Sequence, residues 1–394
     1  MRIIPVTRLI AIICVSALAV VSSFAVQEAA STTALGKKKK KPAVASPVTK
    51  PPNAAKTLGK RKKHPIASGH WTSPTFIPDN TAGDTIDGED LLVRRAAVDA
   101  LGPYNGTVVV ADPNSGRILS MVNQKLALEN GFQPCSTIKI VAALAGLEEG
   151  IIDRNTAMRL YGRTSMNLTT AIAHSNNPYF ANVGIKLGFE RVSYYARLFG
   201  LGEKAGLNII GEEPGLLPEA PPKDGGMGMM TSFGSGISLT PLQLAALVSA
   251  VANGGTLYYL QHPSGKAEAE NFVPRIKRHL AIQRDIPELM PGMMGAVEYG
   301  TARRASYDPN EPIFGKTGTC TDTASPTHLG WFGSFNEVMN KKLTVVVLLT
   351  GGRGVSGPTA SGIAGQIYRA LSQQKYYTQN SKPITPVAMI SGSF

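Results

Sequence analysis

Ser136 and Lys139 have the types and the spacing of a nucleophile and its base. Pro134 predicts that a helix starts just after it, and the apolar residues that continue to Gly150 surround the whole helix circumference. A helix that is apolar on all sides is typically buried. Lys139 would lie one turn after Ser136 on the same face, and burial would lower its pKa. A neutral lysine there could take the proton of the serine hydroxyl.

The Ser-x-x-Lys spacing alone leaves a second interpretation open. It also fits a serine that caps a helix and a lysine that extends its ammonium group to the surface. Ser372 and Lys375 have the same spacing near the end of the chain, where the pattern is typical of a fraying helix end. The assignment therefore depends on the rest of the sequence.

Two further short motifs carry groups that suit such chemistry. Residues 316–319 are Lys-Thr-Gly-Thr. On a strand they would present a cation and two hydroxyls beside a glycine that allows close backbone approach, which suits a substrate carboxylate. An ordinary edge strand with a solvated lysine would fit the same residues. Ser175 and Asn177 lie in a short loop between two predicted helices, where they also fit a plain Asn-Pro turn.

Apolar periodicity predicts a mixed α+β fold. β-Branched residues indicate a hairpin over 107–122, and helical patterns cover 153–202 and 362–371. Late strands are expected over 314–320, 329–335 and 343–349. This order of elements predicts an antiparallel sheet with helices segregated around it.

The order Ser-x-x-Lys, Ser-x-Asn, Lys-Thr-Gly resembles the penicillin-binding transpeptidase family and its β-lactamase relatives. The similarity extends to the longer segments 108–121, 177–181, 199–202, 211–218, 234–245 and 300–302. It covers about residues 85–371. It implies an α+β fold with an antiparallel sheet, flanking helices and an all-helical subdomain.

The resemblance implies a role for each motif residue. Ser136 would be the nucleophile that forms an acyl-enzyme, and Lys139 would be its general base. Ser175 would relay a proton to the leaving amine with help from Lys316. Asn177 would bind the substrate amide and orient Lys139.

Residues of the Lys-Thr-Gly strand would bind the other end of the substrate. Thr317, Gly318 and Thr319 are the implied contacts of the substrate carboxylate, and the backbone N–H groups of Ser136 and Thr319 the implied oxyanion hole. The implied substrates are peptidoglycan stem peptides that end in D-Ala-D-Ala, and β-lactams would acylate the same serine. No metal and no cofactor is implied.

Two of the three cysteines flank these motifs. Cys135 stands directly before the nucleophile, where the family usually has glycine, and Cys320 follows Thr319. Paired cysteines at these positions are similar to a disulfide found in some class A β-lactamases active on carbapenems. The resemblance therefore implies a Cys135–Cys320 disulfide, with two buried free thiols as the alternative.

Three functions share these motifs. We expect a D,D-transpeptidase or D,D-carboxypeptidase, because every motif residue is present. A serine β-lactamase would need a carboxylate base for deacylation, and residues 213–216 faintly resemble the class A loop that supplies one. Leu217 stands where that loop has asparagine, and the segment fits the transpeptidase loop better. A non-catalytic β-lactam sensor or scaffold is the third interpretation.

The net charge of +13 is concentrated in one stretch of the chain. Residues 37–63 contain eleven lysines and arginines and no acid, which leaves +2 for everything else. The remainder is therefore nearly neutral and gives no support to nucleic-acid binding. The Lys/Pro/Ala content predicts a disordered linker over 27–84, which would suit contact with a membrane or an anionic cell-wall polymer.

The N-terminus has the pattern of an export signal. Arg2 and Arg8 precede an uncharged apolar run over 9–26, which fits either a cleaved signal peptide or a retained anchor. We expect an exported protein in the periplasm or on the outer face of the cytoplasmic membrane. Its catalytic domain is expected over 85–375, followed by a weakly ordered tail over 376–394.

Overall fold

The computed structural model describes residues 71–129, 131–207, 209–322 and 326–378. The chain divides into two compact units, Met1–His64 and Pro65–Phe394, and every described residue belongs to the second. The apolar run over 9–26 and the basic stretch over 37–63 lie outside the described residues. Within the described ranges, no helix is both long enough and apolar enough to cross a membrane.

The described unit alternates helices and strands. Its helices are α1 (Leu91–Leu101), α2 (Gln124–Leu128), α3 (Lys139–Glu148), α4 (Leu168–Ala173), α5 (Asn177–Leu198), α6 (Gly226–Phe233), α7 (Pro241–Ala252), α8 (Lys266–Glu270), α9 (Ile286–Glu298) and α10 (Gly357–Gln373). Short 3₁₀ helices are η1 (Cys135–Ile138), η2 (Arg303–Ala305) and η3 (Tyr376–Thr378). The strands are β1 (Gly106–Ala111), β2 (Ile118–Val122), β3 (Met158–Tyr161), β4 (Thr164–Met166), β5 (Thr256–Tyr258), β6 (Ile276–His279), β7 (Ile313–Asp322), β8 (Thr327–Val338) and β9 (Lys341–Gly351).

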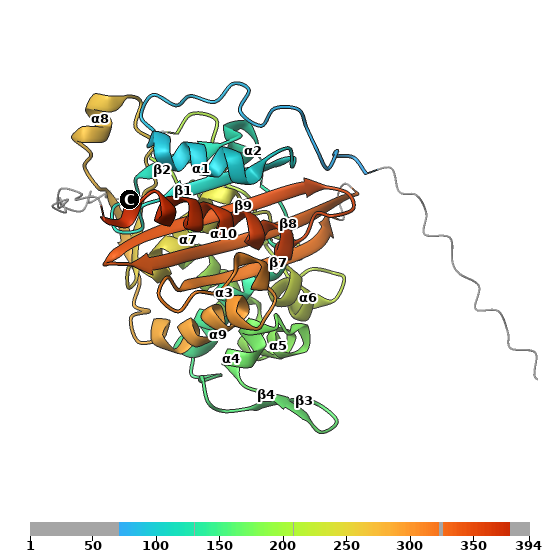
Figure 1. Cartoon of the computed structure of the whole chain (residues 1–394). Coiled ribbons are helices and arrows are strands. Elements are labelled where there is room, and N and C mark those ends of the chain that lie inside the picture. Colours follow the sequence, from blue (N-terminus) through green and yellow to red (C-terminus); the bar gives the residue numbers. More distant parts are fainter. Residues whose placement is uncertain (1–70, 130, 208, 323–325, 379–394) are drawn as a thin grey trace, which may run out of the picture. The chain divides into compact units, whose positions relative to one another are not determined.

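The main sheet has the order β2-β1-β9-β8-β7, with every neighbouring pair antiparallel (Figure 1). β9 lies at its centre, and its β-branched residues are buried on both faces. Val345 and Val347 pack into one hydrophobic core, whereas Val346 and Leu348 pack into the other. The predicted α+β fold with an antiparallel sheet is therefore confirmed, including the early hairpin and the three late strands.

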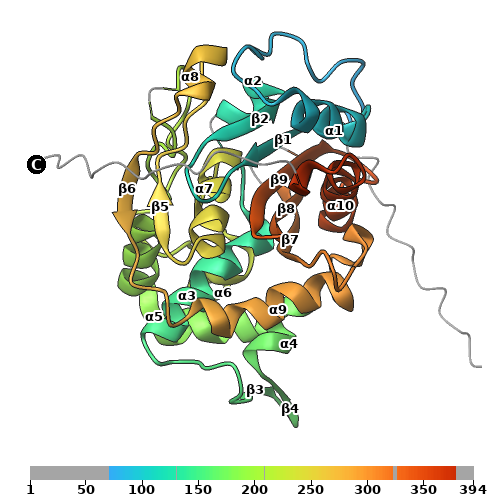
Figure 2. The ribbon, with the colours of Figure 1, turned by 60° about the vertical axis from the view of Figure 1, so that its left-hand side comes forward.

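Helices cover both faces of this sheet. α1 and α10 lie on one face, and α7 and α3 lie on the other (Figure 2). α7 is buried along its whole length, which its all-round apolar sequence requires. Its start is fixed by a capping box, in which Thr240 and Gln243 each satisfy a backbone N–H of the other.

The prediction that 153–202 is helical throughout is wrong at its start. β3 and β4 form a two-stranded hairpin there, with Gly162 in the turn at a φ of 55°. Glycine adopts that left-handed conformation without strain, which suits the tight turn between the two strands. α4 and α5 follow as expected, and Gly188 kinks α5 at a φ of 76°.

Ordered contacts begin before the expected start of the domain at residue 85. The backbone N–H of Thr72 donates to Pro326 O at 3.1 Å. Asn80 is buried, and its side chain donates to the carbonyls of Gly102 and Tyr104. Residues 71–84, which composition assigned to the linker, therefore pack on the domain. At the other end, Tyr377 of η3 is also buried.

Candidate active site

The nucleophile segment comprises η1 and the start of α3. Ser136 lies in η1 and is 8% exposed, and Lys139 is the first residue of α3 and is fully buried. α3 is buried from Lys139 to Gly146, as its all-round apolar sequence predicted. The alternative of a lysine that reaches the surface is therefore wrong for Lys139.

Lys139 Nζ is the centre of a cluster of hydrogen bonds. It lies 3.0 Å from Ser136 Oγ, 3.1 Å from Ser175 Oγ, 2.8 Å from Ser175 O and 2.5 Å from Asn177 Oδ1. Burial lowers the pKa of Lys139 from 10.5 to about 7. A neutral amine has two protons and one lone pair. It can therefore donate to Asn177 and to the Ser175 carbonyl while it accepts the proton of Ser136.

The loop between α4 and α5 positions Ser175 and Asn177. Ser175 has a φ of 54°, a left-handed backbone that turns the chain from one helix into the next. Asn176 caps α5 by accepting a hydrogen bond from Tyr179 N, and Pro178 occupies the first turn. Asn177 is thereby held at the start of α5 with its side chain toward Lys139.

Lys316 approaches the cluster from β7, the edge strand of the sheet. It is fully buried, and its Nζ donates to Thr317 O at 2.9 Å. Burial, together with repulsion from Lys139, holds its pKa well below the usual range. The repulsion between the two ammonium groups favours a state in which one of them is neutral.

Gly318 allows β7 to lie directly against the nucleophile segment. A Cβ at this position would lie 3.0 Å from Pro134 O and 3.2 Å from Cys135 Cβ. Contacts that short leave little room for any side chain. Thr317 and Thr319 flank this glycine, and each hydroxyl has a partner behind it. Thr317 Oγ1 lies 2.6 Å from Thr301 Oγ1, and Thr319 Oγ1 accepts from Gly357 N at 2.8 Å.

The predicted Cys135–Cys320 disulfide is confirmed. The two cysteines are bonded, with their Cα atoms 5.5 Å apart. The bond joins the residue before the nucleophile to the residue after Thr319. It therefore ties η1 to β7.

Sequence reasoning missed several residues that support this cluster. Ser232 O accepts from Ser136 Oγ at 3.4 Å, and its hydroxyl donates to Asn177 O at 2.9 Å. Trp331 Nε1 donates to Gln133 O at 3.0 Å and so supports the segment before the nucleophile. The three contacts join residues that are 96, 55 and 198 positions apart, so no local sequence pattern indicates them.

No group of three or more His, Cys, Asp or Glu residues that could hold a metal ion occurs in the part of the chain that the structure describes. The chemistry of the cluster depends on hydroxyl, amine and amide groups. Such a set suits acyl transfer through a serine.

The comparison with protein families agrees with this geometry. Residues 106–373 match the family model described as "Penicillin binding protein transpeptidase domain". The chain belongs to the penicillin-binding protein transpeptidase family. The match contains every residue of the hydrogen-bonded cluster and both disulfide cysteines.

Similar proteins carry related names. The transpeptidase chain is 28% identical to "Stage V sporulation protein D" of Bacillus subtilis, over 72% of this chain and 52% of that protein. It is 24% identical to "Peptidoglycan D,D-transpeptidase PbpA" of Mycolicibacterium smegmatis, over 71% of this chain and 69% of that protein. The chain thus spans about half the length of the first of these relatives, and 39% of "Penicillin-binding protein H" of Bacillus subtilis.

The fold is also similar to solved structures. The crystal structure of Pseudomonas aeruginosa PBP2 in complex with WCK 5153 superimposes with a TM-score of 0.61 at 23% identity, over 73% of this chain and 78% of that chain. The D,D-transpeptidase domain of a peptidoglycan glycosyltransferase from Eggerthella lenta gives a TM-score of 0.58 at 20% identity, over 72% of this chain and 82% of that chain. These two structures support the transpeptidase fold.

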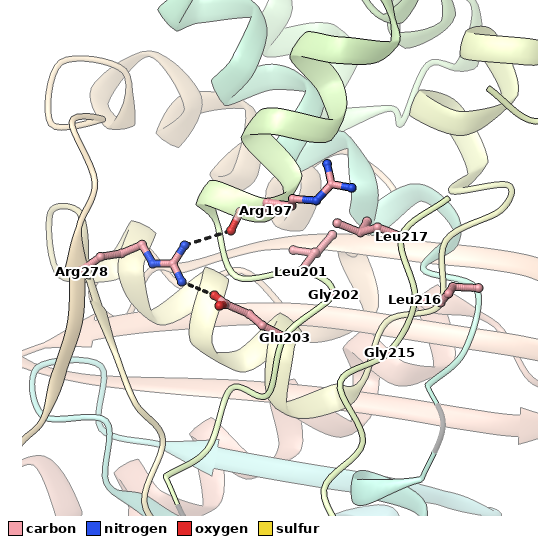
Figure 3. Close-up of a pocket in the computed structure, with 8 residues that line it drawn as sticks. All are labelled: Arg197, Leu201, Gly202, Glu203, Gly215, Leu216, Leu217 and Arg278. Carbon is pink, nitrogen blue, oxygen red and sulfur yellow. Dashed lines mark hydrogen bonds and ion pairs between the residues drawn. The ribbon is translucent and has the colours of Figure 1, made fainter. Parts of the chain in front are cut away.

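A pocket of about 380 Å³ in the transpeptidase domain is lined by other residues (Figure 3). Arg278 donates to Arg197 O at 3.1 Å and to the carboxylate of Glu203, which also pairs with Lys277 Nζ at 2.9 Å. The polar groups of Glu203 and Arg278 are thus engaged in holding the end of α5 against β6. No residue of the Lys139 cluster lines this pocket.

Proposed function

We propose that this protein is an acyl-serine enzyme that acts on the D-Ala-D-Ala ends of peptidoglycan stem peptides, as a D,D-transpeptidase or D,D-carboxypeptidase. One observation carries the proposal. Lys139 Nζ lies 3.0 Å from Ser136 Oγ, and its burial lowers its pKa to about 7. A base with a pKa near the working pH suits proton transfer from a serine.

In the proposed acylation, Ser136 Oγ attacks the carbonyl carbon of the penultimate D-Ala and its proton passes to Lys139. A C–O bond forms, and the carbonyl becomes an oxyanion. The backbone N–H groups of Ser136 and Thr319 would stabilise that oxyanion. The close approach of β7 to η1 at Gly318 supports this arrangement.

Collapse of the intermediate breaks the C–N bond to the terminal D-Ala. The leaving amine takes a proton through Ser175 Oγ, which is 3.1 Å from Lys139 Nζ and so can be resupplied by the lysine. Lys316 would assist this proton relay, and Thr317, Gly318 and Thr319 would bind the substrate carboxylate. Asn177 holds Lys139 through its Oδ1 and offers its amide N–H₂ to the substrate.

The acyl-enzyme would then pass its acyl group to water or to the amine of a second stem peptide. β-Lactams would acylate Ser136 in the same way, with the ring amide in place of the D-Ala-D-Ala bond. Glu213 is the carboxylate of the segment that faintly resembles the class A loop; it is exposed, and Leu217 stands where that loop has asparagine. The missing asparagine argues against a β-lactamase role for this loop.

We also propose the organisation that composition suggests. Residues 1–26 would act as a signal peptide or an anchor, and the basic linker would connect it to the domain and contact an anionic membrane or wall polymer. The protein would then work in the periplasm or on the outer face of the cytoplasmic membrane. The disulfide supports this placement because such bonds persist in oxidising compartments.

The test is acylation by a labelled penicillin, followed by intact mass and peptide mapping over time. We expect one stable adduct on Ser136, no adduct in Ser136→Ala, and release of D-Ala from a stem pentapeptide by the wild type. Rapid loss of the adduct with drug hydrolysis would instead identify a β-lactamase. A wild-type protein that forms no adduct at all would overturn the catalytic proposal.

A further inference from the structure

Thr301 connects two segments that carry candidate catalytic residues. Its backbone N–H donates at 3.1 Å to the carbonyl of Ala173, two residues before Ser175. Its hydroxyl lies 2.6 Å from the hydroxyl of Thr317 on β7. Thr301 thus lies between the Ser175 loop and the strand that carries Lys316.

The backbone around Thr301 is held tightly in this place. A Cβ at position 300 would lie 2.1 Å from Ala173 O, so glycine is needed for the chain to pass so close to the end of α4. On the other side, Ala302 N donates to Ala296 O at 2.7 Å, which fixes the segment to α9. The backbone of Thr301 is therefore held on both sides.

The two threonines that flank Gly318 differ in how their hydroxyl protons are directed. A hydroxyl donates one hydrogen bond and accepts two. Thr319 Oγ1 accepts from the backbone N–H of Gly357 at 2.8 Å, and this leaves its own proton for a ligand. Thr317 Oγ1 is paired with another hydroxyl, so either oxygen can be the donor.

The direction of this second hydrogen bond decides what Thr317 can offer. If Thr317 donates to Thr301, no proton remains for a substrate carboxylate. If Thr301 donates to Thr317, the Thr317 proton is available, and the two bonds polarise each other in the same sense. An anion in front of Thr317 favours the second arrangement, because an anion accepts hydrogen bonds and donates none.

We propose that Thr301 is a positioning residue for the substrate carboxylate. It donates to Thr317 and thereby directs the Thr317 hydroxyl proton to the carboxylate of the stem peptide or the β-lactam. This inference rests on the proposed function. Thr301 acts through Thr317, as Gly357 N acts through Thr319, so both carboxylate-facing hydroxyls are oriented from behind.

The test compares a penicillin with its methyl ester, which lacks the anionic carboxylate. Thr301→Val should lower the acylation efficiency with the free acid about tenfold, the loss expected for one hydrogen bond near a charge. It should leave the slower reaction with the ester unchanged. Thr301→Ser keeps the hydroxyl and should restore the wild-type preference for the acid. Thr321→Val is the matched control. It removes an exposed hydroxyl on the same strand, one that pairs with His328 and not with Thr301 or Thr317.

A double-mutant cycle separates this role from a structural one. In a Thr317→Val background, Thr301→Val should cause no further loss, and the pH at which acylation rises should not change in any variant. Equal losses with acid and ester, or a Thr301→Ser variant as slow as Thr301→Val, would overturn the inference. So would a Thr301→Val variant that keeps the full preference for the acid. A wild type and a Thr321→Val control that form no adduct would overturn the proposed function itself.

Discussion

Removal of the Cys135–Cys320 disulfide should lower the free energy of unfolding by several kcal/mol. The bond joins residues that are 185 positions apart. A crosslink restricts the unfolded chain, and the restriction grows with the length of the closed loop. For a loop of this length the chain-entropy relation gives about 5 kcal/mol at 25 °C. Removal of a native disulfide typically costs about 2–5 kcal/mol, so for this long loop we expect about 3–5 kcal/mol.

The assay is urea unfolding of the wild type and of Cys135→Ala/Cys320→Ala, each with and without a reductant. With a denaturant slope of about 3 kcal/mol/M, the midpoint should fall by about 1–2 M in the double variant. Reductant should lower the urea midpoint of the wild type by the same amount and leave the midpoint of the variant unchanged. The variant thus controls for any effect of the reductant other than cleavage of the disulfide.

A variant midpoint within about 0.3 M of the wild type would refute this reasoning. Such a result would mean that the disulfide does not lower the conformational entropy of the unfolded chain by the amount that its loop length predicts. The bond should also matter to the site, because Cys135 has a φ of 50° and stands next to Ser136. A left-handed backbone costs a non-glycine residue about 1–2 kcal/mol, and loss of the crosslink would let the segment relax. Penicillin acylation should therefore slow in the variant even without urea.

Three further results are expected. Acylation should rise about tenfold per pH unit up to about pH 7 and then level off, because burial lowers the pKa of Lys139 to about 7 and only its neutral amine accepts the serine proton; a flat stopped-flow profile would exclude a lysine base. Gly318→Ala should slow acylation at least about tenfold, because its Cβ would lie 3.0 Å from a carbonyl of the nucleophile segment. Gly265→Ala, where a Cβ meets nothing within 4 Å, should react like the wild type. Burial and the neighbouring Glu148 carboxyl raise the pKa of Asp285 from 3.8 to about 7. The folded state therefore keeps a proton that the unfolded chain loses, and stability should fall by about 1–3 kcal/mol as pH rises from about 4 to 7. Urea midpoints of Asp285→Asn should show a smaller fall, and an unchanged slope would contradict the assignment.

Much of the site could be predicted because its residues lie in short motifs with strong local context. The all-round apolar sequence of α3 predicts a buried helix, and the burial of Lys139 follows from it. The disulfide was predictable from a resemblance, because the two cysteines flank motifs that the fold brings together. The roles assigned to the motif residues remain proposals that the experiments above test.

Other features depend on contacts that no local pattern encodes. Thr301 gains its importance only from Thr317 and Ala173, which lie in different elements. The β3–β4 hairpin was misread because a short exposed hairpin has little apolar periodicity to distinguish it from a helix. Residues 71–84 have the composition of a linker. Nevertheless, the Asn80 side chain donates to the carbonyls of Gly102 and Tyr104, which lie just after the end of α1 and so have no partner within that helix.

The strand order of the main sheet also determines when folding can finish. β1 pairs with β2 on one side and with β9 on the other. β9 is the last of these strands in the sequence, so the ribosome makes it last. The hairpin of β1 and β2 therefore has an unpaired edge until synthesis has passed Gly351. Contacts of such high sequence separation make folding slow. Cys135, too, cannot meet its partner until 185 more residues have been added. The main sheet can therefore be completed only after β9 has been made, and a chain that stops before β9 leaves its nucleophile helix without a completed sheet to pack on.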